Sequence, residues 1–297
     1  MNGLQLSHLT ELAQAQLSLP LHDRLTAVLS DRFVYHERLS LIMREAEGLM
    51  RAPRNLRPRG LMLSGDCGSG KTTIADRLRR LFPSPEACAG AVPTVPALYI
   101  SLVNAEDAQQ IYLRILKALG AGYTGHIRAD ARREMALDLI RVAGVQLLVV
   151  DEVQDLLMFT VRQGQRALTT LKEIMNSQSL PAVFLGTPGA ESVLSRDSHM
   201  VARFTKRVLP SWSADEYLAN FLDAFVSSLP LAKPSQMSSL RMMRLILREC
   251  GPTTGEITRR VQQAAALAIE CGIEQVTEEL IRRAEYEPLQ YALRVPV

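Results

Sequence analysis

The feature that most constrains this chain is the segment GDCGSGKT at residues 65–72. It matches the phosphate-loop pattern G-x-x-x-x-G-K-[ST] at every defined position. Glycines let such a loop turn its backbone N–H groups inward around phosphates, the lysine reaches the β- and γ-phosphates, and the hydroxyl binds Mg²⁺. The apolar run LMLS precedes the loop and an amphipathic stretch follows it, as a strand and a helix would. The segment therefore predicts a nucleotide-binding α/β fold.

Every residue of this loop, and the one after it, is a candidate for nucleotide binding. Lys71 is expected to act on the terminal phosphates as a catalytic group, and Thr72 to bind the metal ion through its hydroxyl. Cys67 is expected to contribute only its backbone. The predicted set is Gly65, Asp66, Cys67, Gly68, Ser69, Gly70, Lys71, Thr72 and Thr73.

A second motif, LLVVDE at residues 147–152, supplies two carboxylates. Its four apolar residues predict a buried strand, whose end would present Asp151 to Mg²⁺ or to metal-bound water. Glu152 follows directly and would polarise the attacking water as a general base. Acidic residues also end many strands as simple caps, so this interpretation depends on the phosphate loop in the same chain. The expected cofactors are ATP and Mg²⁺.

Apolar strand-like runs alternate with amphipathic helical stretches up to Pro210, and only helical patterns follow. Strands that are apolar throughout predict a parallel sheet covered on both faces. We expect them at 61–64, 97–102, 145–150 and 182–186. Beyond Pro210, Ser213 with Glu216 and Thr253 with Glu256 have the spacing of capping boxes. The expected domains are a helical arm at 1–35, a three-layer α/β core at 36–210 and a small all-helical domain at 211–297.

Composition excludes several classes of protein. The net charge of the 297 residues is +3, which is too small to indicate a nucleic-acid partner. The four cysteines form no CxxC pair and have no spacing with histidine that is typical of a zinc site. No apolar run approaches the roughly 20 residues of a membrane span, and the N-terminus lacks the pattern of a signal peptide. A cytoplasmic protein with no membrane partner is expected.

The adjacent Asp-Glu pair separates classes of phosphate-loop protein. The chain has no LSGGQ-like stretch, as an ABC-type ATPase would, and no N-K-x-D, as a guanine-specific GTPase would. Small-molecule kinases usually lack both the Asp-Glu strand end and a separate helical C-terminal domain. The arrangement resembles an AAA+ ATPase, with a three-layer parallel-sheet core and a helical lid.

The order and wording of the later segments resemble one branch of AAA+ proteins. LRPRGLMLSGDCGSGKTT, LLVVDEVQDLL, VFLGTPGAESVL, ARFTKRVLPSW and GEITRRVQQAA follow one another. The chain resembles the TniB/TnsC group of transposition AAA+ ATPases, and most of all TniB. The resemblance implies a bacterial ATP-dependent regulator that oligomerises on target DNA and recruits or activates a DDE-type transposase, switched by ATP hydrolysis. The implied partners are duplex DNA contacted without sequence preference, further copies of the chain in a ring or filament, the transposase and a TniQ-type target-selection protein.

An arginine finger supplied by a neighbouring subunit would make hydrolysis depend on assembly. Arg203, in the segment MVARFTKR, best matches the Arg-Phe position of the family. Arg196 and Arg207 are the alternatives. Each of the three is also compatible with a solvated cation or a local ion pair.

Two further residues are candidates for contacts with the nucleotide. Thr187 follows the expected strand AVFLG and could sense the γ-phosphate through its hydroxyl, or it could simply begin a turn before Pro188. Arg259 could reach the phosphates from the C-terminal lid, with Arg260 as the alternative. The family pattern G-x-x-R would place an arginine at Thr258, so this chain departs from it by one residue.

The resemblance places DNA-backbone contacts after the second strand, in a polar loop and the helix that follows. The candidates are Lys117, Thr124, Arg128 and Arg132, with Tyr123, His126 and Arg133 in the same region. The basic linker that carries Arg51, Arg54, Arg57 and Arg59 is a second candidate, or a subunit interface. Two other functions remain open: an AAA+ loader of the helicase or replication type, and a nucleotide-switched adaptor with little turnover.

Overall fold

The computed structural model describes residues 7–81, 94–104, 107–122 and 127–284. The chain divides into two compact units. The α/β unit comprises Ser40–Pro210, and the helical unit comprises Met1–Leu39 together with Ser211–Val297. Among the described residues, no helix is long and apolar enough to cross a membrane.

Five parallel strands form the sheet of the α/β unit, in the order β2-β3-β4-β1-β5. Because all the strands run in the same direction, their carboxyl ends meet at one edge. β4 lies between the strand that precedes the phosphate loop and the strand that ends in the acidic pair. The strands are β1 (Gly60–Gly65), β2 (Ala97–Ser101), β3 (Leu147–Asp151), β4 (Ala182–Gly186) and β5 (Phe204–Leu209).

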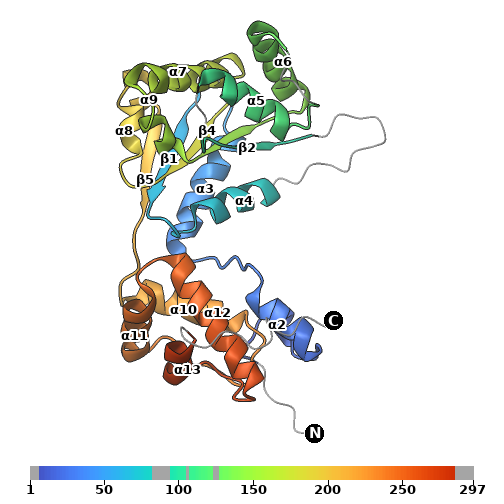
Figure 1. The fold of residues 1–297 in the computed structure, drawn as a ribbon, viewed down its shortest axis with the longest axis vertical. Helices are drawn as coiled ribbons and strands as arrows, with labels where there is room; N and C mark the ends of the chain where they lie inside the picture. The colour runs from blue at the N-terminus through green and yellow to red at the C-terminus, as the bar shows by residue number, and fades with distance from the viewer. Residues whose placement is uncertain (1–6, 82–93, 105–106, 123–126, 285–297) are drawn as a thin grey trace. The chain divides into compact units, whose positions relative to one another are not determined.

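Helices cover both faces of this sheet (Figure 1). The chain crosses from β1 to β2 in one direction and returns through β3 and β4 in the other. Right-handed crossovers therefore place α4 on one face, and the helices of the return path on the opposite face. The helices are α3 (Glu37–Arg51), α4 (Lys71–Leu81), α5 (Ala108–Ala118), α6 (Ala129–Val142), α7 (Val161–Ser177), α8 (Glu191–Leu194) and α9 (Ser198–Val201), with a 3₁₀ turn η1 (Val153–Leu157).

The predicted fold class is confirmed, and the four expected strands lie within two residues of their predicted bounds. The fifth strand, β5, was not predicted. It lies at an edge of the sheet, and only its first and last residues are buried. Its central residues are polar (Thr205, Lys206 and Arg207), so it lacks the apolar run that identified the others.

Two helix starts also differ from the sequence prediction. α7 begins at Val161 rather than near Gln165, because Thr160 and Gln163 form a reciprocal capping box. The helix predicted from Ser213 and Glu216 is capped instead by Asp215, whose carboxylate accepts from the Leu218 N–H at 3.0 Å. The hydroxyl of Ser213 donates to that carboxylate at 2.6 Å. A charged acceptor makes the stronger cap, so Asp215 takes the position.

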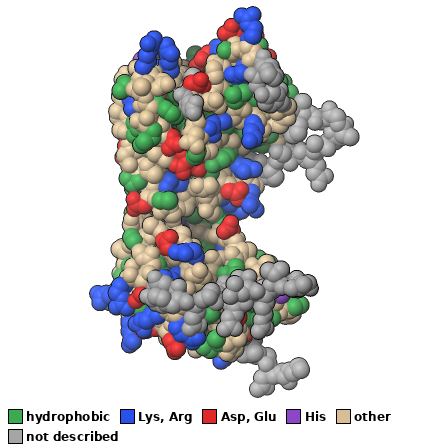
Figure 2. Space-filling model, in the orientation of Figure 1, with side chains coloured by type: hydrophobic (Ala, Val, Ile, Leu, Met, Phe, Trp, Pro, Cys, Tyr) green, Lys and Arg blue, Asp and Glu red, His purple; other side chains and the backbone are tan. Residues whose placement is uncertain are grey.

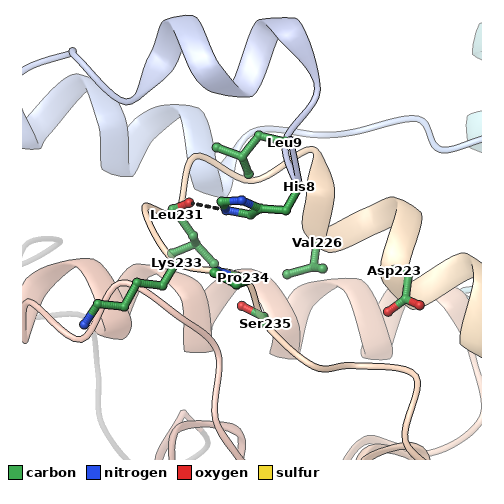
Figure 3. Close-up of a pocket in the computed structure, with 8 residues that line it drawn as sticks. All are labelled: His8, Leu9, Asp223, Val226, Leu231, Lys233, Pro234 and Ser235. Carbon is green, nitrogen blue, oxygen red and sulfur yellow. Dashed lines mark hydrogen bonds between the residues drawn. The ribbon is translucent and has the colours of Figure 1, made fainter. Parts of the chain in front are cut away.

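The helical unit joins the first helices of the chain to the last ones. Leu25 and Val28 of α2 are buried in the same apolar core as α10 and α12. Arg24 forms an ion pair with Glu274, and His8 lies 3.2 Å from the carbonyl oxygen of Leu231 (Figure 3). The residues expected as an arm therefore share a core with the C-terminal helices. The elements are α1 (Glu11–Gln16), α2 (Leu21–Leu29), α10 (Glu216–Ser227), α11 (Leu240–Cys250), α12 (Thr254–Glu270) and α13 (Glu278–Arg283).

The only tryptophan of the chain, Trp212, reports on this unit. Its ring stacks on Phe221, with 4.7 Å between the ring centroids, and its indole N–H donates to the hydroxyl of Thr254 at 2.9 Å. Trp212 is 6% exposed, so unfolding of the helical unit would transfer it to water.

Replacing Leu25 with Ala should lower the free energy of unfolding of the helical unit by about 2–5 kcal/mol, because it leaves a cavity in the core. The change is measured as a shift in the denaturation midpoint that Trp212 fluorescence reports. Leu21→Ala on the same helix is the matched control, since Leu21 is 53% exposed. Equal midpoints for the two variants would show that α2 is not part of the cooperative unit.

Candidate nucleotide site

The phosphate loop connects the end of β1 at Gly65 to the start of α4 at Lys71. Gly68 and Gly70 have φ angles of 77° and 96°, which residues with a Cβ rarely adopt. In the part of the chain that the structure describes, neither of these two amides donates a hydrogen bond. The first turn of α4 adds further unpaired N–H groups and the positive end of the helix dipole. The loop is therefore a site for an anion, and its chemistry suits a phosphate.

Lys71 is folded back onto the loop that precedes it. It is 6% exposed, and its ammonium donates to the carbonyl oxygens of Gly65 and Asp66, each at 2.7 Å. A Cβ at Gly65 would lie 2.7 Å from Oγ of Ser69 and 2.9 Å from Cβ of Leu209, so only glycine fits there. The cation is thus held at the loop by the loop's own backbone.

Asp151 ends β3 and collects three donors from three elements. Its Oδ2 accepts from the hydroxyl of Tyr99 on β2 at 3.0 Å and from that of Thr72 on α4 at 3.3 Å. Its Oδ1 accepts from the backbone N–H of Glu152 at 2.9 Å. The structure therefore brings the two predicted metal ligands, Thr72 and Asp151, into direct contact.

Burial is the largest influence on the pKa of the Asp151 carboxyl. Asp151 is 2% exposed, and desolvation raises its pKa, with a further contribution from the neighbouring charge of Glu152. Its hydrogen bonds act in the opposite direction but do not cancel this effect. Desolvation and the Asp151 charge also raise the pKa of Tyr99 to about 12, so the phenol keeps its proton and remains a donor. No Lys or Arg is hydrogen-bonded to Asp151 within the described ranges.

Glu152 has a left-handed backbone, with φ 57° and ψ 41°. This conformation costs a non-glycine residue about 1–3 kcal/mol and is common at functional sites. The side-chain amide of Gln154 donates to the Glu152 carboxylate, and its oxygen accepts from the backbone N–H of Thr187 at 3.1 Å. Since β4 pairs with β3, Thr187 lies beside the acidic pair, and its hydroxyl has no hydrogen-bond partner among the described residues.

Sequence reasoning missed two residues of this cluster, Tyr99 and Gln154. Tyr99 lies within an apolar strand, where an aromatic residue is ordinarily read as core. Gln154 lies two residues after the acidic pair, and no spacing rule indicated a role for it. The contacts of Tyr99 with Asp151 and of Gln154 with Thr187 depend on which strands are neighbours in the sheet.

The three arginine-finger candidates have different environments. Arg196 lies over Gly164 of α7 and donates to the carbonyl oxygen of Leu156 at 3.1 Å. Arg207 forms an ion pair with Glu45 of α3, with its Nε 3.0 Å from the carboxylate. Arg203 donates to the neutral side chain of Asn176 at 2.7 Å. Within the described residues, Arg207 is thus paired with a carboxylate, whereas Arg203 and Arg196 donate to neutral oxygens.

The two lid candidates belong to the helical unit. Arg259 is exposed and forms an ion pair with Glu256 one turn earlier. Arg260 is 7% exposed and donates to the carbonyl oxygens of Ile281 at 3.1 Å and Glu249 at 3.4 Å. Arg260 therefore contributes to packing within the helical unit, and Arg259 is the one that faces solvent.

The predicted DNA residues are only partly gathered on the surface. Lys117 at the end of α5 and Arg128 before α6 are exposed, whereas Thr124, Tyr123 and His126 lie outside the described residues. Arg132 is half-buried and donates to the carbonyl oxygen of Ile127 at 3.0 Å, and Arg133 forms an ion pair with Glu173. In the basic linker, Arg54 donates to the carbonyl oxygen of Val145 at 2.8 Å.

A separate small pocket, of about 170 Å³, lies in the helical unit. Figure 3 shows the ammonium of Lys233 and the carboxylate of Asp223 on opposite sides of His8. Its polar groups do not converge on one point, unlike those around Asp151. We therefore place the chemistry at the phosphate loop.

Comparisons with known proteins agree with this architecture. The family model described as "Bacterial TniB protein" matches residues 24–214, and no curated protein matches the chain. Among solved structures, the ORC1 protein of Aeropyrum pernix in complex with DNA has a TM-score of 0.63 at 19% identity, covering 88% of this chain and 68% of that chain. For the ORC2 protein of the same organism, in ADPNP-ADP complexes, the TM-score is 0.60 at 18% identity, covering 88% and 71%. For Cdc6p of Pyrobaculum aerophilum the TM-score is 0.59 at 16% identity, covering 91% of this chain and 74% of that chain. Such low identities show the fold alone, which is that of AAA+ ATPases.

Replacing Asp151 with Asn should raise the midpoint of thermal unfolding of the nucleotide-free, magnesium-free protein by about 2–4 °C at pH 7. Because burial raises the pKa of Asp151, the folded state holds this proton to higher pH than the unfolded state does. The wild-type carboxylate therefore destabilises the fold above its folded pKa, and the gain should disappear as the pH falls below the ordinary aspartate value.

The matched control is Asp138→Asn on α6, because the Asp138 side chain is exposed and forms only a surface ion pair with Arg141. Differential scanning fluorimetry in EDTA across the acidic range measures both variants. A midpoint for Asp151→Asn at or below that of the wild type at pH 7 would contradict the prediction.

Proposed function

The chain belongs to the TniB family and has the AAA+ fold, and from this premise we propose that it is an ATP-hydrolysing regulator of DNA transposition. It assembles on double-stranded DNA when ATP is bound. The observation that carries the proposal is the convergence of Thr72, Asp151 and Glu152 beside the phosphate loop, at the carboxyl edge of the sheet. Ligands of open parallel sheets bind at this edge.

The site suits a magnesium ion. Mg²⁺ prefers oxygen ligands and usually combines one or two carboxylates with phosphates and waters. Thr72 and Asp151 supply a hydroxyl and a buried carboxylate that has no bonded cation among the described residues. When bound there, Mg²⁺ would neutralise charge on the transferred phosphoryl group.

We assign a separate role to each residue of the site. Lys71 and the amides of the loop would hold and orient the phosphates, and Thr72 and Asp151 would hold the metal ion. Glu152 orients the attacking water and accepts its proton. Thr187 offers a hydroxyl just after β4, unpaired among the residues that the structure describes, where it can contact the γ-phosphate.

We assign the arginine finger to Arg203, which would act on a neighbouring subunit. Its carbonyl oxygen accepts from the N–H of Gly60 at 3.0 Å, at the amino end of β1. The phosphate loop begins at Gly65, at the other end of that strand, which is roughly 17 Å away at about 3.3 Å per residue. An arginine side chain cannot extend this far, so Arg203 can complete only the site of another copy. Hydrolysis would then require assembly.

DNA contact is proposed for the exposed end of α5 and start of α6, where Lys117 and Arg128 lie. The ORC1 protein of Aeropyrum pernix, which shares this fold, was solved with DNA. Cationic and anionic side chains are intermixed on the face shown in Figure 2, rather than gathered in one basic field. This agrees with a few phosphate contacts that position the protein without reading sequence.

The family also supplies the partners. We propose that the assembled ATP-bound form recruits or activates a DDE-type transposase and responds to a TniQ-type target-selection protein. The alternatives are a helicase or replication loader and a nucleotide-switched adaptor, and they differ from this proposal in the partner bound and in whether hydrolysis is needed.

Glu152→Gln should lower the rate of ATP hydrolysis by about 100-fold or more, because the general base is lost while the phosphate contacts remain. This variant should therefore stay assembled on duplex DNA in ATP. Sedimentation with DNA in ATP, in ADP and without nucleotide measures the effect.

Adding Lys117→Glu and Arg128→Glu to this variant should weaken DNA binding and reduce its salt dependence. Arg141→Glu, also exposed on α6, is the control.

The proposal would be overturned if the protein sedimented as a monomer and did not bind DNA in any nucleotide state. Unchanged hydrolysis in Glu152→Gln would favour the adaptor, and binding to a helicase rather than a transposase would favour the loader.

Arg203→Ala should lower hydrolysis by about 1000-fold, the usual contribution of an arginine finger. Mixing this variant with Lys71→Ala, which is inactive at its own site, should restore part of the activity. Arg203 of the Lys71→Ala subunits then completes the nucleotide site of the Arg203→Ala subunits, whose phosphate loop is intact. Arg207→Ala is the comparison, and we expect it to retain activity because Arg207 is paired with Glu45. A steady-state ATPase assay that finds no recovery in the mixture would contradict action between subunits.

A further inference from the structure

From the contacts of its side-chain amide, we infer that Gln154 is a positioning residue that fixes the Glu152 carboxylate and connects it to the end of β4. The amide donates to Glu152 on one side and accepts from the Thr187 N–H on the other. This inference rests on the proposed function, because it concerns how the general base of ATP hydrolysis is held.

The orientation of the amide follows from its two neighbours. A backbone N–H can only donate, so the amide oxygen must face Thr187. An ionised carboxylate can only accept, so the NH₂ group must face Glu152. The reversed orientation would place donor against donor and acceptor against acceptor. Gln154 therefore accepts a hydrogen bond from the main chain just after β4 and donates one to the carboxylate of the base, and it can do so in only one orientation.

The surrounding backbone leaves room for this relay. A Cβ at Gly186 would lie 2.9 Å from the amide oxygen of Gln154 and 2.5 Å from Cβ of Ala190. A glycine at this last position of β4 thus admits the glutamine. The left-handed backbone of Glu152 carries the chain into η1, on which Gln154 is placed. The left-handed backbone of Glu152 and the missing side chain of Gly186 therefore both accommodate Gln154.

Both contacts need a donor and an acceptor at the end of a side chain of this length. Glutamate has the same length and could accept from Thr187, but it has no donor and would place a second negative charge against Glu152. Methionine has similar length and neither group. Because Thr187 is also where the proposed γ-phosphate sensor lies, any displacement of the end of β4 would be transmitted to the base through this amide.

The experiment compares Gln154→Glu and Gln154→Met in steady-state ATPase assays, with binding of a fluorescent ATP analogue measured in parallel. We expect kcat to fall by about 10-fold or more, as when residues that hydrogen-bond to the reacting groups of other catalytic sites are removed. KM and analogue affinity should be unchanged, because the interaction acts only in the chemical step. Gln165→Met, an exposed glutamine of α7, is the matched control.

The double variant separates positioning from a general loss of structure. In the Glu152→Gln background, Gln154→Met should cause no further loss of activity, because the group it positions is already gone. Full additivity, or a fall in analogue affinity equal to the fall in kcat/KM, would overturn the inference. So would unchanged kcat in both single variants while Glu152→Gln remains inactive. If Glu152→Gln itself kept full activity, the proposed function would fail instead.

Discussion

The arrangement of the candidate site depends on one constraint: β4 lies between β1 and β3. Parallel strands end at the same edge, so this order sets the phosphate loop, Thr187 and the acidic pair side by side. Because β4 stands between them, Lys71 after β1 and Asp151 at the end of β3 are not on neighbouring strands. The start of α4 crosses this gap and brings the Thr72 hydroxyl to the Asp151 carboxylate. Without β4 in this place, Gln154 would have no main-chain donor to meet.

Desolvation links function to stability at this edge. Asp151 is buried because the ends of β2 and β3 and the start of α4 close around it, and the same burial makes its negative charge unfavourable. Hydroxyls from Tyr99 and Thr72 compensate only in part. Among the described residues, no cation is hydrogen-bonded to this carboxylate, so a metal ion held there, as proposed, would relieve a cost already present in the folded chain.

The sequence predicts those features that rest on local patterns. The phosphate loop, the strand that ends in Asp151 and Glu152, and the fold class all follow from short motifs and apolar periodicity. β5 could not be predicted because an edge strand needs no apolar centre, and Asp215 rather than Ser213 caps α10 because a nearby carboxylate competes for the N–H group. The contacts of Tyr99 with Asp151 and of Gln154 with Thr187 follow only from strand order, which no single segment encodes. The same holds for Arg133, whose partner Glu173 lies 40 residues away.

The bonds of Lys71 within its own loop bear on how the loop would bind a phosphate. Its ammonium already bonds to the carbonyl oxygens of Gly65 and Asp66. Binding of a phosphate at this cation would be an exchange of partners, in which the number of hydrogen bonds hardly changes. The enthalpy gained at Lys71 should therefore be small, and the favourable part of binding should come from the loop's unpaired amides and from charge neutralisation.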